Sequence, residues 1–242
     1  MRYLTSLIDY LSSQLLPSRC FICHDYCADT EPLCQECRQN LPFLAKSCEL
    51  CAATLEVATD TRCGACLIRP PAYEQLIAGF AYALPINSFI IQLKFHRQLS
   101  YAHLLGRLFS KILQTHYVNC PLPEAIVPVP LHRERLKERG FNQAMEIAKP
   151  IATALKLPIL HRLVERNKPT TPQSQLPKQA RKRNMAQAFT VKKATPMKHI
   201  ALLDDVMTTG ETIQALSRQL KQAGIETIHV WCVAKRMLDY EG

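Results

Sequence analysis

Apolar residues in this chain occur either in short continuous runs or at helical spacing. Short apolar runs are typical of buried strands, and residues repeating at i, i+3 and i+4 are typical of helices. The pattern predicts strands over residues 78–83, 125–130, 159–164, 188–191, 200–205 and 227–233. It predicts helices over residues 85–95, 101–116, 141–156 (with Pro150 as a kink or break) and 213–223. Strands that alternate with helices indicate an α/β fold with a parallel sheet, here over residues 72–242.

The first 17 residues also show helical spacing, with leucines at positions 4, 7, 11 and 15. They lack the continuous apolar segment of a signal peptide. The chain contains no run of 18 uncharged apolar residues, so we expect no integral membrane span. We expect residues 1–17 to form an amphipathic helix packed on the protein, with loose membrane or partner docking as the alternative. Because nothing in the sequence exports the chain, we expect it to be cytoplasmic.

Eight of the eleven cysteines form four C-x-x-C pairs, and ten or eleven residues separate successive pairs. The pairs are Cys20/Cys23, Cys34/Cys37, Cys48/Cys51 and Cys63/Cys66. Two thiolates at this spacing can hold one metal ion, and two such pairs complete a tetrahedral four-sulfur site. Residues 18–71 contain few large apolar side chains, so metal binding would supply their folding free energy. We therefore expect a zinc-ribbon module there, with one or two structural Zn²⁺ ions.

The spacing leaves the pairing of these cysteines open. Consecutive pairs would give two ribbons, whereas a cross-braced arrangement would join the first pair to the third and the second to the fourth. Disulfides would need an oxidising compartment, and an iron–sulfur cluster fits ribbon-like spacing less well than zinc. Cys27 is either an additional thiol or a substitute ligand. Cys120 and Cys232 are isolated in or near apolar stretches and are interpreted as buried or incidental thiols.

The most informative motif begins with the apolar run Ile200–Leu203, which ends in the adjacent acids Asp204 and Asp205. A loop of small polar residues precedes the next helix and contains Thr208, Thr209, Gly210 and Thr212. Such a loop can direct N–H groups and hydroxyls at a phosphate, and the helix dipole favours the anion. We expect the loop to hold a 5′-phosphate and the two acids to hold the ribose hydroxyls, directly or through Mg²⁺.

This stretch resembles the signature of type I phosphoribosyltransferases, which bind phosphoribosyl pyrophosphate (PRPP). The resemblance implies a type I phosphoribosyltransferase-like parallel sheet flanked by helices. A strand, turn and helix whose acids only cap the helix and contact solvent is the alternative interpretation.

Positive charge is concentrated in one part of the chain. Residues 129–199 contain 16 Lys and Arg against 4 Asp and Glu, while the whole chain has a formal charge of +10. Such a local excess favours phosphate-rich partners over a merely solvated loop. Phe141 and Phe189 are the aromatic residues in this basic segment. Their small number favours contacts to a nucleic-acid backbone rather than to its bases.

Residues 127–143, with the sequence VPVPLHRERLKERGFNQ, resemble the hallmark of the ComF family of competence proteins. Further matching segments are Lys94–Phe95, Thr171–Leu176 and Arg181–Phe189, and the four cysteine pairs also belong to this family. The resemblance implies that residues 130–140 form a pyrophosphate loop in which Arg133, Arg135 and Arg139 neutralise phosphates or a DNA backbone. It also implies that residues 166–184 form a flexible loop bringing Arg181 and Arg183 over a bound phosphate.

Membership in the ComF family implies a protein that handles incoming single-stranded DNA during natural transformation, with a pocket for PRPP or a nucleotide-like ligand. An active phosphoribosyltransferase acting on an unidentified base or amine is the alternative, and the sequence identifies no pocket for that acceptor. A third hypothesis, compatible with the first, is an adaptor whose zinc module binds a DNA-translocating helicase or a recombination mediator.

Overall fold

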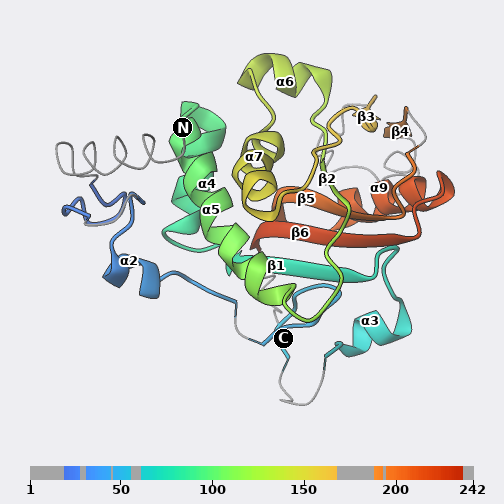
Figure 1. Cartoon of the computed structure of the whole chain (residues 1–242), viewed down its shortest axis with the longest axis horizontal. Helices are drawn as coiled ribbons and strands as arrows, with labels where there is room; N and C mark the ends of the chain where they lie inside the picture. The colour runs from blue at the N-terminus through green and yellow to red at the C-terminus, as the bar shows by residue number, and fades with distance from the viewer. Residues whose placement is uncertain are drawn as a thin grey trace, which may run out of the picture. The chain divides into compact units, whose positions relative to one another are not determined.

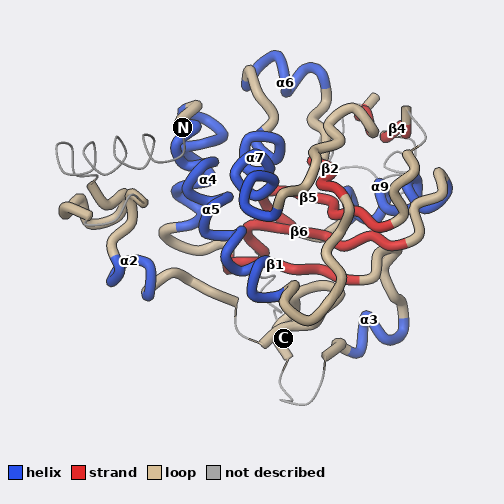
Figure 2. Tube along the Cα trace, viewed as in Figure 1, coloured by secondary structure: helices blue, strands red, loops and turns tan. Residues whose placement is uncertain are grey.

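Four parallel strands form the central sheet in the order β1-β6-β5-β2 (Figure 2). Their bounds are Gln75–Ala81 (β1), Thr227–Lys235 (β6), His199–Met207 (β5) and Ala125–Pro128 (β2). The two central strands, β5 and β6, are buried almost throughout because helices cover both faces of the sheet, as the continuous apolar runs predict. The expectation of an α/β fold with a parallel sheet is confirmed.

The computed structural model describes residues 19–27, 31–44, 46–55, 61–167, 188–192 and 195–236. The helix expected over residues 1–17 lies outside these residues. The chain divides into two units, residues 1–42 and 43–242. This division falls between the second and third cysteine pairs, so Cys48, Cys51, Cys63 and Cys66 belong to the same unit as the sheet.

Three helices cover one face of the sheet and one long helix lies on the other (Figure 1). The first group is α4 (Ile86–His96), α5 (Leu99–His116) and α7 (Gln143–Leu155), and the opposite helix is α9 (Glu211–Gln222). Glycines allow two close approaches on the first face. A Cβ at Gly79 of β1 would lie 2.9 Å from the Phe109 ring, and one at Gly106 of α5 would lie 2.4 Å from Pro150 Cγ. The α7 helix is continuous across Pro150, so the expected break is absent.

Two of the expected strands do not join the parallel sheet. Strand β3 (Val164–Arg166) pairs antiparallel with β4 (Phe189–Val191) in a separate two-stranded sheet. Ile159, where the first of these strands was expected to begin, contributes an isolated parallel bridge to Ile126 at the edge of the main sheet. Apolar runs identify extended segments but do not specify the partner strand. The expectation that all these strands belong to one parallel sheet was therefore wrong for β3 and β4.

A short helix, α6 (Arg133–Arg139), occupies the segment that was expected to be a loop. His132 caps its first turn, where its Nδ1 accepts a hydrogen bond from the N–H of Glu134 at 3.4 Å. Gly140 ends the helix with a φ of 87°, a conformation that glycine adopts without steric cost. The three arginines of this segment are therefore presented on a helix rather than on an extended loop.

The segment that carries the second set of cysteines packs on the α9 side of the sheet, next to edge strand β1. The Tyr73 hydroxyl donates to the carbonyl of Leu50 at 2.7 Å, and the N–H of Leu76 donates to the carbonyl of Glu49 at 2.6 Å. The rings of Phe43 and Phe80 lie 5.1 Å apart. These contacts make the cysteine segment part of the hydrophobic core of the unit spanning residues 43–242.

Two one-turn helices accompany the cysteines, α2 (Gln35–Gln39) in the first unit and α3 (Gly64–Ile68) in the second. Within the described residues, no helix combines the length and the apolar content needed to cross a membrane.

Candidate functional site

The eight paired cysteines form two separate four-sulfur groups. Cys20, Cys23, Cys34 and Cys37 form one group and Cys48, Cys51, Cys63 and Cys66 the other, with all sulfurs of a group within 4.8 Å of one another. The consecutive pairing is therefore confirmed, and the cross-braced alternative is wrong. Cys27 is in neither group.

The geometry of both groups fits a tetrahedral zinc site. The sulfurs of Cys23 and Cys34 lie 3.8 Å apart and those of Cys51 and Cys63 lie 3.6 Å apart. A tetrahedron with Zn–S bonds of about 2.3 Å has sulfur–sulfur edges of ~3.8 Å, whereas a disulfide bond is about 2.0 Å long. All these cysteines are free thiols. Four sulfurs leave no open coordination position, so both sites are consistent with structural zinc.

Backbone N–H groups support the sulfurs of both clusters. The N–H of Ile22 donates to Cys20 Sγ at 3.4 Å, and the N–H of Cys63 donates to Cys48 Sγ at 3.3 Å. Such hydrogen bonds favour the thiolate form, which is the form that binds a metal. The supporting N–H comes from the turn within the pair at Cys20 and from the facing pair at Cys48.

The candidate phosphate loop connects β5 to α9 at the carboxyl edge of the sheet, where ligands bind in folds of this kind. Thr208 and Thr209 are exposed, Thr212 is partly exposed, and Gly210 adopts a φ of 75° immediately before α9. The first turn of a helix leaves N–H groups without intrahelical partners, and these attract an anion. The structure therefore brings the four predicted loop residues together at a helix N-terminus.

A buried lysine holds this loop from the neighbouring strand. Lys235, at the end of β6, is paired in register with Met207 of β5. Its Nζ donates to the carbonyl of Thr208 at 2.7 Å and to that of Arg236 at 3.0 Å. Burial lowers the pKa of Lys235 below its usual value. The sequence gives no local sign of this contact, because the partner carbonyl is 27 positions away in the chain.

Asp204 and Asp205 have different surroundings, because successive side chains of a strand point to opposite faces of the sheet. Asp205 is 3% exposed and forms an ion pair with Lys94 of α4. Its Oδ1 also accepts a hydrogen bond from Gln143 Nε2 at 3.2 Å. Asp204 is partly exposed, and its Oδ1 accepts from the N–H of Asp205 at 2.9 Å.

These surroundings shift the two pKa values in opposite directions. Burial would raise the pKa of Asp205, but the Lys94 ammonium and the hydrogen bonds it receives lower it below the usual value. Burial and the adjacent Asp205 carboxylate raise the pKa of Asp204 well above its usual value. Asp205 is therefore the ionised, paired member. Asp204 is the member whose charge depends on what binds next to it.

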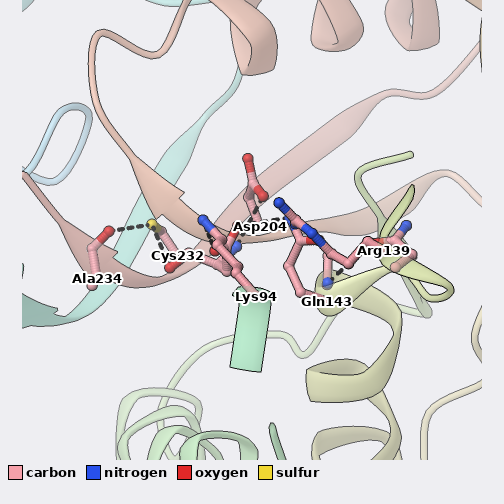
Figure 3. Close-up of polar contacts among 9 residues, drawn as sticks. Lys94, Arg139, Gln143, Asp204, Cys232 and Ala234 are labelled. Carbon is pink, nitrogen blue, oxygen red and sulfur yellow. Dashed lines mark hydrogen bonds and ion pairs between the residues drawn. The ribbon is translucent and has the colours of Figure 1, made fainter. Parts of the chain in front are cut away.

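The paired acid connects to one of the predicted arginines. Figure 3 shows Lys94, Gln143 and Arg139 side by side near Asp204 at the end of β5. Arg139 Nη1 donates to Gln143 Oε1, which places the guanidinium one side chain away from Asp205. Asn142 fixes this turn, since its Nδ2 donates to the carbonyl of Val129 at 3.0 Å and its Oδ1 accepts from the N–H of Ala144 at 3.0 Å.

Further arginines lie on α6 and on β3. Arg133 and Arg135 are exposed on α6, which stands out from the sheet in Figure 1. Burial lowers the pKa of Arg166 on β3, the charge of Arg135 lowers it further, and Asp204 raises it. Arg166 is thus within electrostatic range of both an α6 arginine and the site acid. Arg181 and Arg183, predicted to close over a phosphate, lie outside the described residues.

A cavity of about 240 Å³ adjoins the phosphate loop on the side of the second cysteine cluster. Thr209 and Glu211 line it at the start of α9, and Arg218 lines it two turns further along the helix. Arg69 and Pro70, which follow α3, close it from the cysteine segment.

The described parts of the chain thus combine a four-stranded parallel α/β sheet, an acid-and-threonine loop at its carboxyl edge and two four-cysteine zinc-ribbon clusters. Residues 11–67 match the model of the double zinc ribbon domain family. Competence protein F of Haemophilus influenzae is 33% identical over 210 residues, which cover 84% of this chain and 90% of the relative. The chain belongs to the ComF/YhgH competence family.

Two further relatives extend this comparison. The DNA utilization protein YhgH of Salmonella typhi is 30% identical over 225 residues, 92% of this chain and 99% of the relative. Competence protein ComFC of Bacillus subtilis is 33% identical over 119 residues, 48% of this chain and 43% of the relative.

Proposed function

We propose that this protein handles single-stranded DNA during natural transformation or DNA utilization. The names of its relatives suggest this role, and the excess of Lys and Arg over residues 129–199 supports it. We further propose that the site binds a phosphorylated ribose, as in PRPP or a nucleotide. The main support for the proposal is that three groups lie at the same edge of the sheet. They are Asp204, the exposed threonines and the arginines of α6.

The structure suggests separate tasks for the residues of this site. The N–H groups and hydroxyls of residues 208–212 would hold the 5′-phosphate, and Asp204 would accept hydrogen bonds from the ribose hydroxyls or bind Mg²⁺. Asp205 would act indirectly, because its carboxylate is already occupied by Lys94 and Gln143. Arg133 and Arg135, exposed on α6, would contact pyrophosphate or the DNA backbone.

Binding to single-stranded DNA is expected to weaken steeply with salt, because each phosphate contact releases counterions. Changing both Arg133 and Arg135 to alanine should lower affinity and reduce the slope of log K against log[salt] by about 1.4, or ~0.7 per lost contact. Fluorescence anisotropy of labelled oligo(dT) at several salt concentrations measures this slope. The matched control is Lys198→Ala, because Lys198 is an exposed cation just before β5, at the end of the strand opposite Asp204. Equal slopes for the parent and the double variant would contradict the proposed contacts.

Titration with PRPP and Mg²⁺ should release or absorb heat in a calorimeter, and Asp204→Asn should abolish that heat. The substitution removes an acid whose ionisation is disfavoured by burial, so the variant should unfold at the same temperature as the parent or higher. Thermal unfolding of the variant therefore separates loss of binding from loss of structure. No heat with the parent protein would reject the ribose-phosphate assignment.

An active phosphoribosyltransferase is the second candidate, favoured by the exposed threonine loop at the N-terminus of a 12-residue helix. In that reaction the bond from ribose C1 to pyrophosphate breaks, a nitrogen of the acceptor bonds to C1, and the acceptor loses a proton. Pyrophosphate release in the presence of nucleobases or amines would favour this function. PRPP binding without release across a broad panel would favour a binding role.

A further inference from the structure

An aromatic side chain is exposed next to the candidate site, on an element outside the basic segment. Phe95, in the last turn of α4, is 70% exposed. Ile91, one turn earlier, and Leu99, at the start of α5, are also exposed. These three exposed apolar side chains lie on α4, the helix that supplies Lys94 to Asp205, and at the start of α5. A large aromatic ring exposed beside other apolar side chains is typical of an interaction site.

Arg139 lies over the face of this ring. Its guanidinium carbon is 5.9 Å from the centroid of Phe95, within the range of a cation–π contact. The same guanidinium donates to Gln143, which donates to Asp205. The Phe95–Arg139 pair is thus connected by hydrogen bonds through Gln143 to Asp205, the acid next to the candidate ribose-binding residue.

A second contact fixes the two helices that carry the pair. Arg97, at the C-terminal end of α4, donates from Nη2 to the carbonyl of Glu138 near the end of α6 at 2.9 Å. The platform is therefore prearranged, which lowers the entropy cost of binding a flat ligand. The adjacent α6 carries four Lys and Arg against two Glu in seven residues, so the surroundings favour an anionic ligand.

We propose that Phe95 and Arg139 form a stacking platform for one nucleobase of a single-stranded DNA chain. The inference rests on the proposed function, since the sugar-phosphate of the same chain would contact Asp204, the threonine loop and α6. Aromatic rings and arginine planes stack on bases without sequence preference, and a protein that handles arbitrary DNA needs such contacts. Base stacking would thus add to the backbone contacts that the basic segment predicts.

Binding of a normal and an abasic oligonucleotide tests the platform. The probes are labelled oligo(dT) of about 12 nucleotides, within the usual ~4–16 nucleotide site sizes, and an abasic chain of equal length and charge. We expect Phe95→Ala to weaken oligo(dT) binding about 5-fold or more, with an unchanged salt slope, and to leave abasic binding unchanged. Phe95→Tyr should retain most of the affinity. Because Phe95 is exposed, the alanine variant should unfold as the parent does.

A tryptophan at the same position provides a direct signal. The single native tryptophan, Trp231, is fully buried. Phe95→Trp should therefore add an emission that oligo(dT) quenches and the abasic chain does not. The matched control is Val118→Trp, because Val118 is 73% exposed and follows α5 at the end opposite Leu99, about 27 Å along the helix.

The outcomes distinguish this inference from the function on which it rests. Normal binding of oligo(dT) by the alanine variant, or equal quenching at positions 95 and 118, would overturn the platform and leave DNA binding intact. Failure of the parent protein to bind either probe would overturn both proposals.

Discussion

Changing Cys63 to serine is expected to destabilise the whole unit spanning residues 43–242, and not only the zinc site. Cys63 is a partly exposed ligand of the second cluster, so the change removes a thiolate with little loss of packing. Structural zinc in small domains contributes roughly 10 kcal/mol or more of binding free energy, and weakening one site costs a large share of it. We expect a loss on the order of 3–5 kcal/mol, or about 6–20 °C in the melting temperature of a unit of this size.

The physical reason is that the second cluster holds the segment that packs on β1. Loosening it releases the hydrogen bonds from Tyr73 to Leu50 and from Leu76 to Glu49. Ala52 would also leave the core on the α9 side of the sheet. The same loss should lower affinity for ligands at the β5–α9 loop, because the cavity beside Thr209 is closed by residues that follow this cluster.

Cys34→Ser is the matched control. Cys34 is also a partly exposed ligand, but it belongs to the first cluster and to the unit spanning residues 1–42. Metal analysis should find about two zinc ions in the parent and fewer in both variants, with scanning calorimetry reporting the main transition. An unshifted transition for Cys63→Ser, with its zinc lost, would show that the second cluster does not support the sheet.

Local sequence signals were sufficient for the parts of the fold that depend on neighbouring residues. The apolar run from Ile200 to Leu203 and the helix after Gly210 appear as expected, since burial and helical period are both local patterns. The α6 helix was missed although its signals are present. Seven good helix formers precede Gly140, a stop signal, but the expectation of a pyrophosphate loop led to their being interpreted as a loop.

Features that depend on distant residues could not be read from the sequence. The spacing of the cysteines allows two pairings, and only the three-dimensional arrangement of the turns selects the consecutive one. Likewise, nothing near Asp205 in the sequence indicates that Lys94, 111 positions earlier, is its ion-pair partner. The adjacent acids therefore looked equivalent in the sequence. In the structure Asp205 is buried and paired with Lys94, whereas Asp204 is partly exposed.

Removing Lys94, the ion-pair partner of the buried Asp205, is the second change with a large expected effect. Asp205 is 3% exposed, and in Lys94→Met it would lose its cationic partner while Gln143 still donates a hydrogen bond to it. Leaving one charge of a buried pair uncompensated typically costs about 3–5 kcal/mol. We expect a loss of that order at pH 7 in urea unfolding. Lys149→Met, which breaks an exposed pair with Glu146, should cost about 1 kcal/mol or less.

The stability difference between the parent and Lys94→Met should depend on pH, because the two proteins hold the Asp205 carboxyl at different pKa values. In the parent, the lowered pKa of Asp205 provides stability that is present above the unfolded-state pKa of about 3.9 and is lost as the pH falls through the folded-state value. Without Lys94, burial should instead raise the pKa of Asp205. The Asp205 carboxylate then destabilises the variant at neutral pH, and this effect disappears once the carboxyl group is protonated. The difference in stability between parent and variant should therefore shrink between pH 7 and pH 5.

Comparing parent and variant at each pH cancels effects common to both, including the pH dependence of zinc binding. The double variant Lys94→Met with Asp205→Leu removes both charges and should recover much of the lost stability. A stability difference that stays constant with pH, or a double variant less stable than Lys94→Met, would show that lysine packing rather than charge pairing supports the site.

Recovery of stability in the double variant would also allow a functional test. DNA binding through Arg139 should be weaker there than in the parent, because Gln143, which accepts a hydrogen bond from Arg139, would lose its own contact with Asp205.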